Sequence, residues 1–175
     1  MPENSLQVPE NLSFPNAIAL TQTLLDRSSD LADAEIESMV TGLVATENGA
    51  RGFFVTFLSD DRSLADQPSE AIVTALRSSP DIVSELLVKN LAMSAAMAVH
   101  HRRNQDEGAA EGSDRVQRRS LHLIRLLNLP QTRDLAQKLH ESAATGQGEY
   151  KAFLDRWSYD AEQRQTIEQT VSQVM

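Results

Sequence analysis

Arginine side chains gather in the middle of this sequence, where they could bind carboxylate or phosphate groups. The chain holds thirteen arginines against three lysines, and a guanidinium group makes planar, bidentate contacts with such anions. Two of the arginines are expected to end a long helix, and others to line one face of the next helix beside His122 and Arg125. The predicted partner-binding residues are Arg102, Arg103, Arg115, Arg118 and Arg119.

The same arginines also have structural explanations. A basic side chain at the C-terminal end of a helix interacts favourably with the helix dipole, and the outer face of any helix must be polar. Residues 1–70 hold twelve acidic and three basic side chains, a distribution that serves solubility or presents an acidic face to a basic partner. That acidic part could also dock on the arginines, within one molecule or between two copies in a dimer.

His100 and His101 are the weak candidates for a metal site. Neighbouring residues on a helix point about 100° apart, whereas a helical metal pair uses positions i and i+4. Asp106 and Glu107 would have to complete such a site. The alternative function is therefore a small-molecule- or metal-binding enzyme with a pocket near His100, His101 and Asn90.

No catalytic signature is present, and we predict no catalytic residue, no metal and no cofactor. The chain has no cysteine, which excludes disulfides, thiolate zinc ligands and a cysteine nucleophile. Gly146 and Gly148 lack the third glycine and the preceding strand of a dinucleotide-binding loop. Asp60 and Asp61 are typical of a turn.

A long helix over residues 80–103 is the strongest structural prediction. Ser79, Pro80 and Asp81 supply an N-cap, a proline at the first helical position and an acid in the first turn. Charged and amide side chains interrupt the apolar run and predict a core helix of a soluble fold, with no membrane span. The expected inner face consists of Val83, Leu86, Leu87, Leu91, Met93, Met97 and Ala98.

Shorter helices are predicted on both sides of this helix. Ala32 and Glu35 are expected at the N-cap and N3 positions of a helix that Asn48–Gly49 would end. Residues 53–58 are aromatic and β-branched, which suits either a strand or a short buried helix, and we favour the helix because no partner strand is evident. Pro68 and Ser113 are expected to open two further helices.

These patterns predict an all-α, single-domain bundle of about six to eight helices around the helix over 80–103. Residues 1–13 are expected to form a flexible arm, residues 14–175 the helical domain, and residues 104–113 a mobile loop within it.

The predicted function is that of a soluble helical adaptor or regulatory protein that acts through protein–protein contacts. The net charge of −9 argues against nucleic-acid binding. The N-terminal residues have neither the basic start nor the apolar run of a secretory signal, so we expect a cytoplasmic protein. Its partner would be another protein or a second copy of the chain, the latter giving a structural homodimer as a further alternative.

Overall fold

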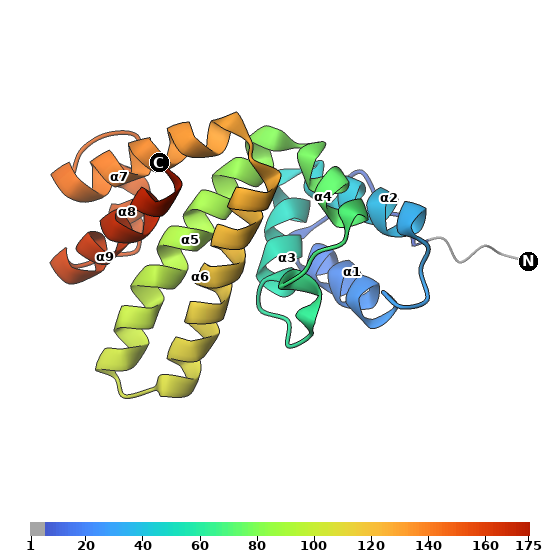
Figure 1. Ribbon diagram of the computed structural model, residues 1–175, viewed down its shortest axis with the longest axis horizontal. Helices are drawn as coiled ribbons and strands as arrows, with labels where there is room; N and C mark the ends of the chain where they lie inside the picture. The colour runs from blue at the N-terminus through green and yellow to red at the C-terminus, as the bar shows by residue number, and fades with distance from the viewer. Residues whose placement is uncertain (1–5) are drawn as a thin grey trace, which may run out of the picture. The chain divides into compact units, whose positions relative to one another are not determined.

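A computed structural model describes residues 6–175, and the fold over these residues is all-α, as predicted. It has nine α-helices and two short 3-10 helices, with no strand in the described part of the chain (Figure 1). The helix number exceeds the predicted six to eight by one. The helices gather into two compact units, Met1–Leu86 and Leu87–Met175, and each is described by itself.

Unit 1 contains four complete helices and the 3-10 turn η1. Helix α1 packs on α3, and α2 packs on both α3 and α4. Its core is built around three phenylalanines with no exposed surface, of which Phe53 and Phe57 are stacked with ring centroids 4.9 Å apart. The elements are α1 (Phe14–Asp26), α2 (Asp33–Val44), α3 (Glu47–Phe57), η1 (Ser63–Ala65) and α4 (Glu70–Arg77).

Residues 53–57 belong to helix α3, which confirms the helix prediction for this segment. The prediction that Asn48–Gly49 ends the preceding helix is wrong. Thr46 is the N-cap of α3 and accepts a hydrogen bond from the backbone N–H of Gly49 at 3.2 Å, so Asn48 and Gly49 lie in the first turn of α3. Because the Thr46 side chain caps the new helix α3, Gly49 lies inside that helix and does not end α2.

The predicted start of α2 is confirmed. The backbone N–H of Ala32 donates to Glu35 Oε1 at 3.2 Å. Leu31, before the N-cap, and Ile36, at position N4, are both buried, which is the arrangement known as a hydrophobic staple. Helix α4 begins two residues after Pro68, because Ser69 is its N-cap and accepts from the N–H of Ile72.

Part of the predicted flexible arm packs on unit 1. Residues 1–5 of that arm lie outside the described residues. Leu12 is only 5% exposed, and Val8 lies against Gly42 so closely that a Cβ added to the glycine would come within 2.8 Å of the Val8 Cβ. The segment from Val8 to Leu12 is therefore attached to the helices by apolar contacts.

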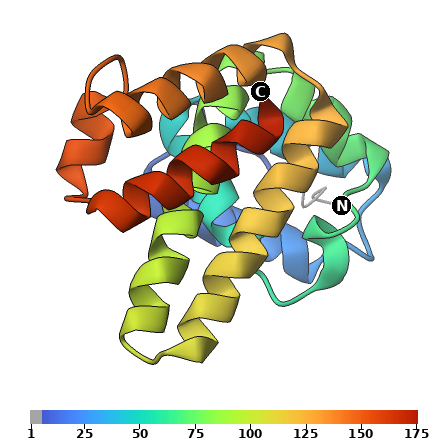
Figure 2. The ribbon, with the colours of Figure 1, turned by 60° about the vertical axis from the view of Figure 1, so that its left-hand side comes forward.

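Unit 2 contains most of α5 (Pro80–Arg103) and all of the later helices. Helices α5 and α6 run antiparallel and side by side as a hairpin (Figures 1 and 2). Helix α7 packs on α9, and the final 3-10 turn η2 contacts α6, α7 and α9. The remaining elements are α6 (Glu107–Leu127), α7 (Pro130–Thr145), α8 (Lys151–Arg156), α9 (Ala161–Val171) and η2 (Ser172–Val174).

The predicted loop over 104–113 is mostly helical. Only residues 104–106 separate α5 from α6, and Gln105 adopts a left-handed φ of 57° in this turn. Asp106 caps α6 by accepting from the N–H of Ala109 at 3.1 Å, and Glu107 lies in the first turn, where the helix dipole favours an acid. Ser113, predicted to cap this helix, lies inside it.

The bounds of α5 are confirmed, but part of its inner face differs from the prediction. Ala92, Ala95 and Ala96 are buried, whereas Met97 is 36% exposed. Val83, Leu87 and Leu91 of the predicted face are fully buried, so the small alanines extend the buried arc and Met97 lies outside it. By length and composition α5 is apolar enough to cross a membrane, but more than half of its apolar window is buried inside this fold, as in a core helix.

Candidate functional site

Arg102, one of the predicted binding residues, clamps the two arms of the α5–α6 hairpin together. Its two terminal nitrogens donate to both carboxylate oxygens of Asp114 on α6, at 2.6 and 3.2 Å, and one of them also reaches Glu107 Oε1 at 3.2 Å. These hydrogen bonds, led by those to Asp114, raise the pKa of Arg102. Because the contact to Asp114 is bidentate, it fixes the relative register of the two helices.

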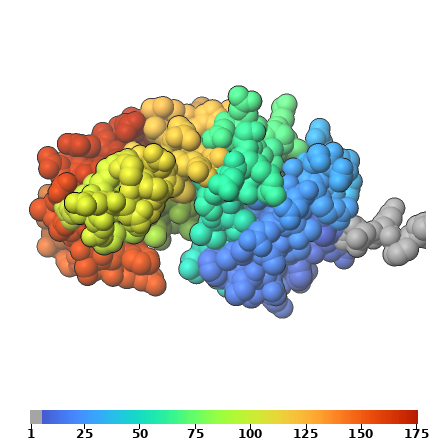
Figure 3. Space-filling model, turned by 90° about the horizontal axis from the view of Figure 1, so that it is seen from below, coloured from blue at the N-terminus to red at the C-terminus, as the bar shows by residue number. Residues whose placement is uncertain are grey.

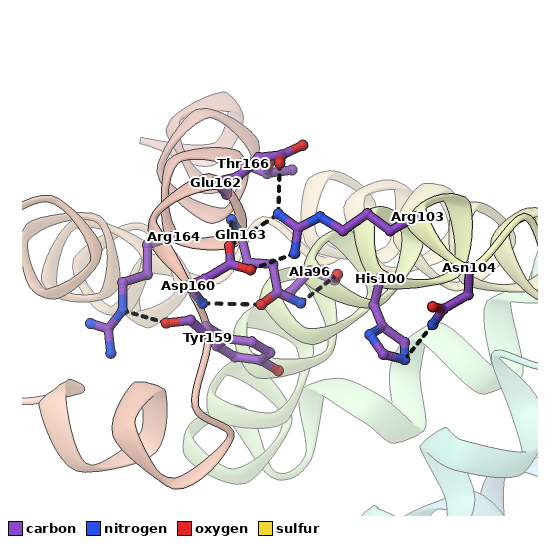
Figure 4. Close-up of polar contacts among 10 residues, drawn as sticks. All are labelled: Ala96, His100, Arg103, Asn104, Tyr159, Asp160, Glu162, Gln163, Arg164 and Thr166. Carbon is purple, nitrogen blue, oxygen red and sulfur yellow. Dashed lines mark hydrogen bonds and ion pairs between the residues drawn. The ribbon is translucent and has the colours of Figure 1, made fainter.

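Arg103 joins the end of α5 to the start of α9 (Figure 4). Its guanidinium group donates to both carboxylate oxygens of Asp160 and to Glu162 Oε2, the last at 2.6 Å. Arg103 and the backbone N–H of Gln163 lower the pKa of Asp160 to about 2. In the space-filling view, the tip of the hairpin lies beside the surface of α9, as these ion pairs require (Figure 3).

Arg102 and Arg103 are thus each bound by two carboxylates of the same chain. These carboxylates lie between residues 107 and 162, in the same unit as the two arginines. The shallow hollow beside the pair, of about 400 Å³, is lined by both arginines and by Asp114 and Glu162. Its formal charges cancel, which makes the end of the hairpin a poor site for an acidic partner.

The other three predicted residues lie on α6 in different environments. Arg119 is only 3% exposed, so it belongs to the interior of the fold. Arg118 is exposed and Arg115 is partly buried. The sequence placed all five arginines on one binding surface, but the structure gives them different exposures: Arg119 is buried, Arg115 is partly buried, and the other three are exposed.

A basic surface continues along α6 from Arg115. Arg115, Arg118, His122 and Arg125 are spaced by three, four and three residues and share one side of the helix; we call these four residues the basic α6 face. Residues 115–133 include five arginines and no aspartate or glutamate, in a chain of net charge −9. Among the described residues, neither Arg125 nor Arg133 forms an ion pair.

The histidines give no support for a metal site. His100 is exposed, and its Nε2 lies 3.2 Å from the side-chain amide of Asn104. The rings of His100 and His101 lie 5.6 Å apart in an edge-to-face arrangement. Within residues 6–175 no group of three or more His, Cys, Asp or Glu side chains is placed to hold a metal ion.

Ser94 is a buried polar residue on α5. Ser94 is 6% exposed and donates to the backbone oxygen of Asn90 at 2.7 Å. The Ser94 hydroxyl therefore bonds back to its own helix.

Arg133 is the candidate residue that the sequence reasoning missed. It lies in the first turns of α7, beyond the break at Asn128 to Pro130, and was not grouped with the arginines of α6. The signal was present in the sequence, since the stretch between Asp114 and Asp134 holds no acidic residue.

The fold and this surface define an all-α protein with an exposed basic helix face. Its sequence matches a family model described as an uncharacterised conserved protein over residues 13–174, so the chain belongs to that family. Neither the curated proteins nor the solved structures contain a match to it.

Proposed function

We propose that this chain is a non-catalytic cytoplasmic interaction protein whose basic α6 face binds an acidic segment of a partner protein. The observation that carries the proposal is the absence of any acidic residue between positions 115 and 133 of an otherwise acidic chain. Three side chains of the face, Arg118, His122 and Arg125, are exposed. The proposal keeps Arg115 and Arg118 from the sequence prediction, leaves out Arg102, Arg103 and Arg119, and adds His122 and Arg125.

Electrostatics favours a protein partner over nucleic acid. A phosphate backbone would meet the repulsion of the whole chain at net charge −9, and its binding depends on releasing many counterions along an extended basic surface. A short acidic segment needs only the local positive potential of one helix face. Arginine binds such carboxylates through charge-assisted hydrogen bonds, which fix the orientation of the partner as well as attract it.

The first experiment measures the binding of a fluorescein-labelled oligoglutamate peptide by fluorescence anisotropy, at low and at physiological salt. We expect binding that weakens as salt rises, because exposed charges are screened over a Debye length of about 8 Å at 0.15 M ionic strength. The double variant Arg118→Glu with Arg125→Glu should bind at least about tenfold more weakly, since attraction becomes repulsion at two positions.

A matched control makes the same change in net charge at two positions outside the basic α6 face. Arg51 and Arg156 are exposed and lie over the rings of Phe14 and Trp157 rather than on the α6 face. Arg51→Glu with Arg156→Glu should leave peptide binding within about twofold of wild type. Equal losses in both double variants would contradict the proposal, because they would show an effect of net charge alone.

A second copy of the chain is the other acidic partner to test, since residues 1–70 hold twelve acids against three bases. Light scattering over a range of protein and salt concentrations distinguishes the two. Salt-sensitive dimers that Arg118→Glu with Arg125→Glu dissociates would assign the face to self-association. Tight binding of a single-stranded oligonucleotide without binding of oligoglutamate would overturn the proposal.

A further inference from the structure

A second feature of the positive surface is a hollow where α6 meets α7. Helix α6 ends at Leu127, its C-cap residue Asn128 adopts the left-handed conformation (φ 48°, ψ 47°), and α7 begins at Pro130. The abrupt turn and the final residues of the chain enclose a space of about 450 Å³. We call it the α6–α7 hollow; it is lined by Ile124, Arg125, Asn128, Leu129, Pro130, Thr132, Arg133, Gln173, Val174 and Met175.

The side chains that line the α6–α7 hollow carry two positive charges and no negative one. Arg125 comes from the last turns of α6 and Arg133 from the first turns of α7. Among the described residues, neither guanidinium group has a side-chain carboxylate or the carboxylate of Met175 within 4.0 Å. The two arginines are therefore available to a bound anion.

Other hollows of similar size in the chain differ in charge. The hollow beside Arg102 and Arg103 also contains Asp114 and Glu162. A hollow in unit 1 along α2 contains Glu35, and another beside Thr46 contains Glu10 and Glu47. Neither of these two contains a basic side chain. Among these four hollows, the one at the α6–α7 turn is thus the one with basic and no acidic side chains.

The uncharged residues of the α6–α7 hollow complete an anion site. The side chains of Asn128 and Gln173 can each donate a hydrogen bond to an oxyanion. Ile124, Leu129 and Val174 contribute apolar surface to the same hollow. The positive end of the α7 dipole adds to the field of the two arginines, which remain the main source of the attraction.

We propose that the α6–α7 hollow binds a phosphate group, with Arg125 and Arg133 as its charged ligands. A phosphate monoester carries a charge of about −1.5 to −2 at neutral pH and three acceptor oxygens. It therefore matches two guanidinium groups and two neutral donors better than a single carboxylate does. The inference rests on the proposed function, because Arg125 also belongs to the basic α6 face, and it identifies the preferred partner segment as acidic and phosphorylated.

The test compares two labelled peptides by anisotropy, an oligoglutamate peptide with one central phosphoserine and the same peptide with glutamate at that position. We expect the phosphopeptide to bind roughly tenfold more tightly to the wild-type protein. Arg133→Gln should abolish this preference while oligoglutamate still binds. The matched variant Arg118→Gln, which lies on the α6 face outside the hollow, should weaken both peptides to a similar extent and keep the preference.

Three further measurements complete the test. Circular dichroism verifies that Arg133→Gln retains the helical fold. Arg133→Lys, which keeps the charge but loses the bidentate geometry, should restore part of the preference. The third measurement is the melting temperature with inorganic phosphate. If phosphate raises it for the wild type but not for Arg133→Gln, and the phosphopeptide binds no more tightly than oligoglutamate, the site binds free phosphate.

The outcomes separate this inference from the proposed function. Two results would overturn the phosphate site and leave the acidic partner in place. The first is equal affinity for the two peptides without a phosphate-dependent rise in melting temperature. The second is a preference for the phosphopeptide that persists in Arg133→Gln. Failure of both peptides to bind the wild-type protein would overturn the proposed function itself.

Discussion

Arg103, near the end of α5, binds both carboxylate oxygens of Asp160, the N-cap residue of α9 (Figure 4). Asp160 Oδ1 also accepts the backbone N–H of Gln163 at 2.9 Å, and the Gln163 side chain returns a hydrogen bond by accepting from the Asp160 N–H at 3.1 Å. A second bond runs from Gln163 Nε2 to the backbone oxygen of Ala96 at 3.2 Å. One carboxylate thus caps α9 and links it to α5.

Because of Asp160, the free energy of unfolding should decrease as the pH falls into the acid range. Its pKa lies at about 2 instead of 3.8, because Arg103 and the Gln163 N–H favour the ionised form. A carboxylate whose pKa is lower in the folded state stabilises the protein fully above pH 4 and loses that effect as the pH falls toward 2. In Asp160→Asn, the urea midpoint should therefore fall less steeply between pH 4 and pH 2 than in the wild type.

A second substitution at this position separates the ion pair from the cap. Asparagine remains a good N-cap residue, whereas alanine does not. At pH 7, we expect the urea midpoint to decrease from wild type to Asp160→Asn and further to Asp160→Ala. Identical pH profiles for the wild type and Asp160→Asn would show that the carboxylate contributes nothing through its charge.

Two glycines within helices should respond to alanine in opposite directions. At Gly52 on α3, an added Cβ would lie 2.4 Å from the Ala17 Cβ and 2.9 Å from the Phe14 carbonyl oxygen, both on α1. Gly52→Ala should lower the free energy of unfolding by about 1–3 kcal/mol, because this overpacking exceeds the gain in helix propensity. Urea unfolding followed by circular dichroism measures the change.

Gly112 on α6 is the matched control, because a Cβ there would meet nothing within 4 Å. Gly112→Ala should raise the free energy of unfolding by about 0.5–1 kcal/mol, the usual advantage of alanine over glycine inside a helix. Stabilisation by Gly52→Ala would contradict the close approach of α1 and α3.

Phe53 should be among the most sensitive positions of unit 1. Its side chain has no exposed surface and stacks on Phe57, so Phe53→Ala should cost about 3–5 kcal/mol in a urea titration. Val55 on the same helix is 50% exposed, and Val55→Ala should change the free energy of unfolding by less than about 0.5 kcal/mol. Similar losses at both positions would contradict the assigned inner face of α3.

The sequence by itself determined the helical class and the bounds of several elements. Capping residues and prolines act locally, so Ser79–Pro80–Asp81 and the pair Ala32 and Glu35 specify helix starts without long-range information. Local signals were misread where two of them competed, as at Thr46 and Gly49, and where an aspartate cap at Asp106 extended a helix into a segment rich in glycine and acid.

Only the tertiary structure decided which arginines are exposed and which carboxylates lie beside Arg102 and Arg103. The sequence prediction groups Arg102, Arg103 and Arg119 with Arg118. Spacing along a helix shows on which side of that helix a residue lies, but it does not show which residues of other helices lie beside it. The fold brings Asp114 to Arg102 and Asp160 to Arg103, and it buries Arg119. It also places Arg125 and Arg133 around one hollow, because the left-handed turn at Asn128 reverses the chain between them.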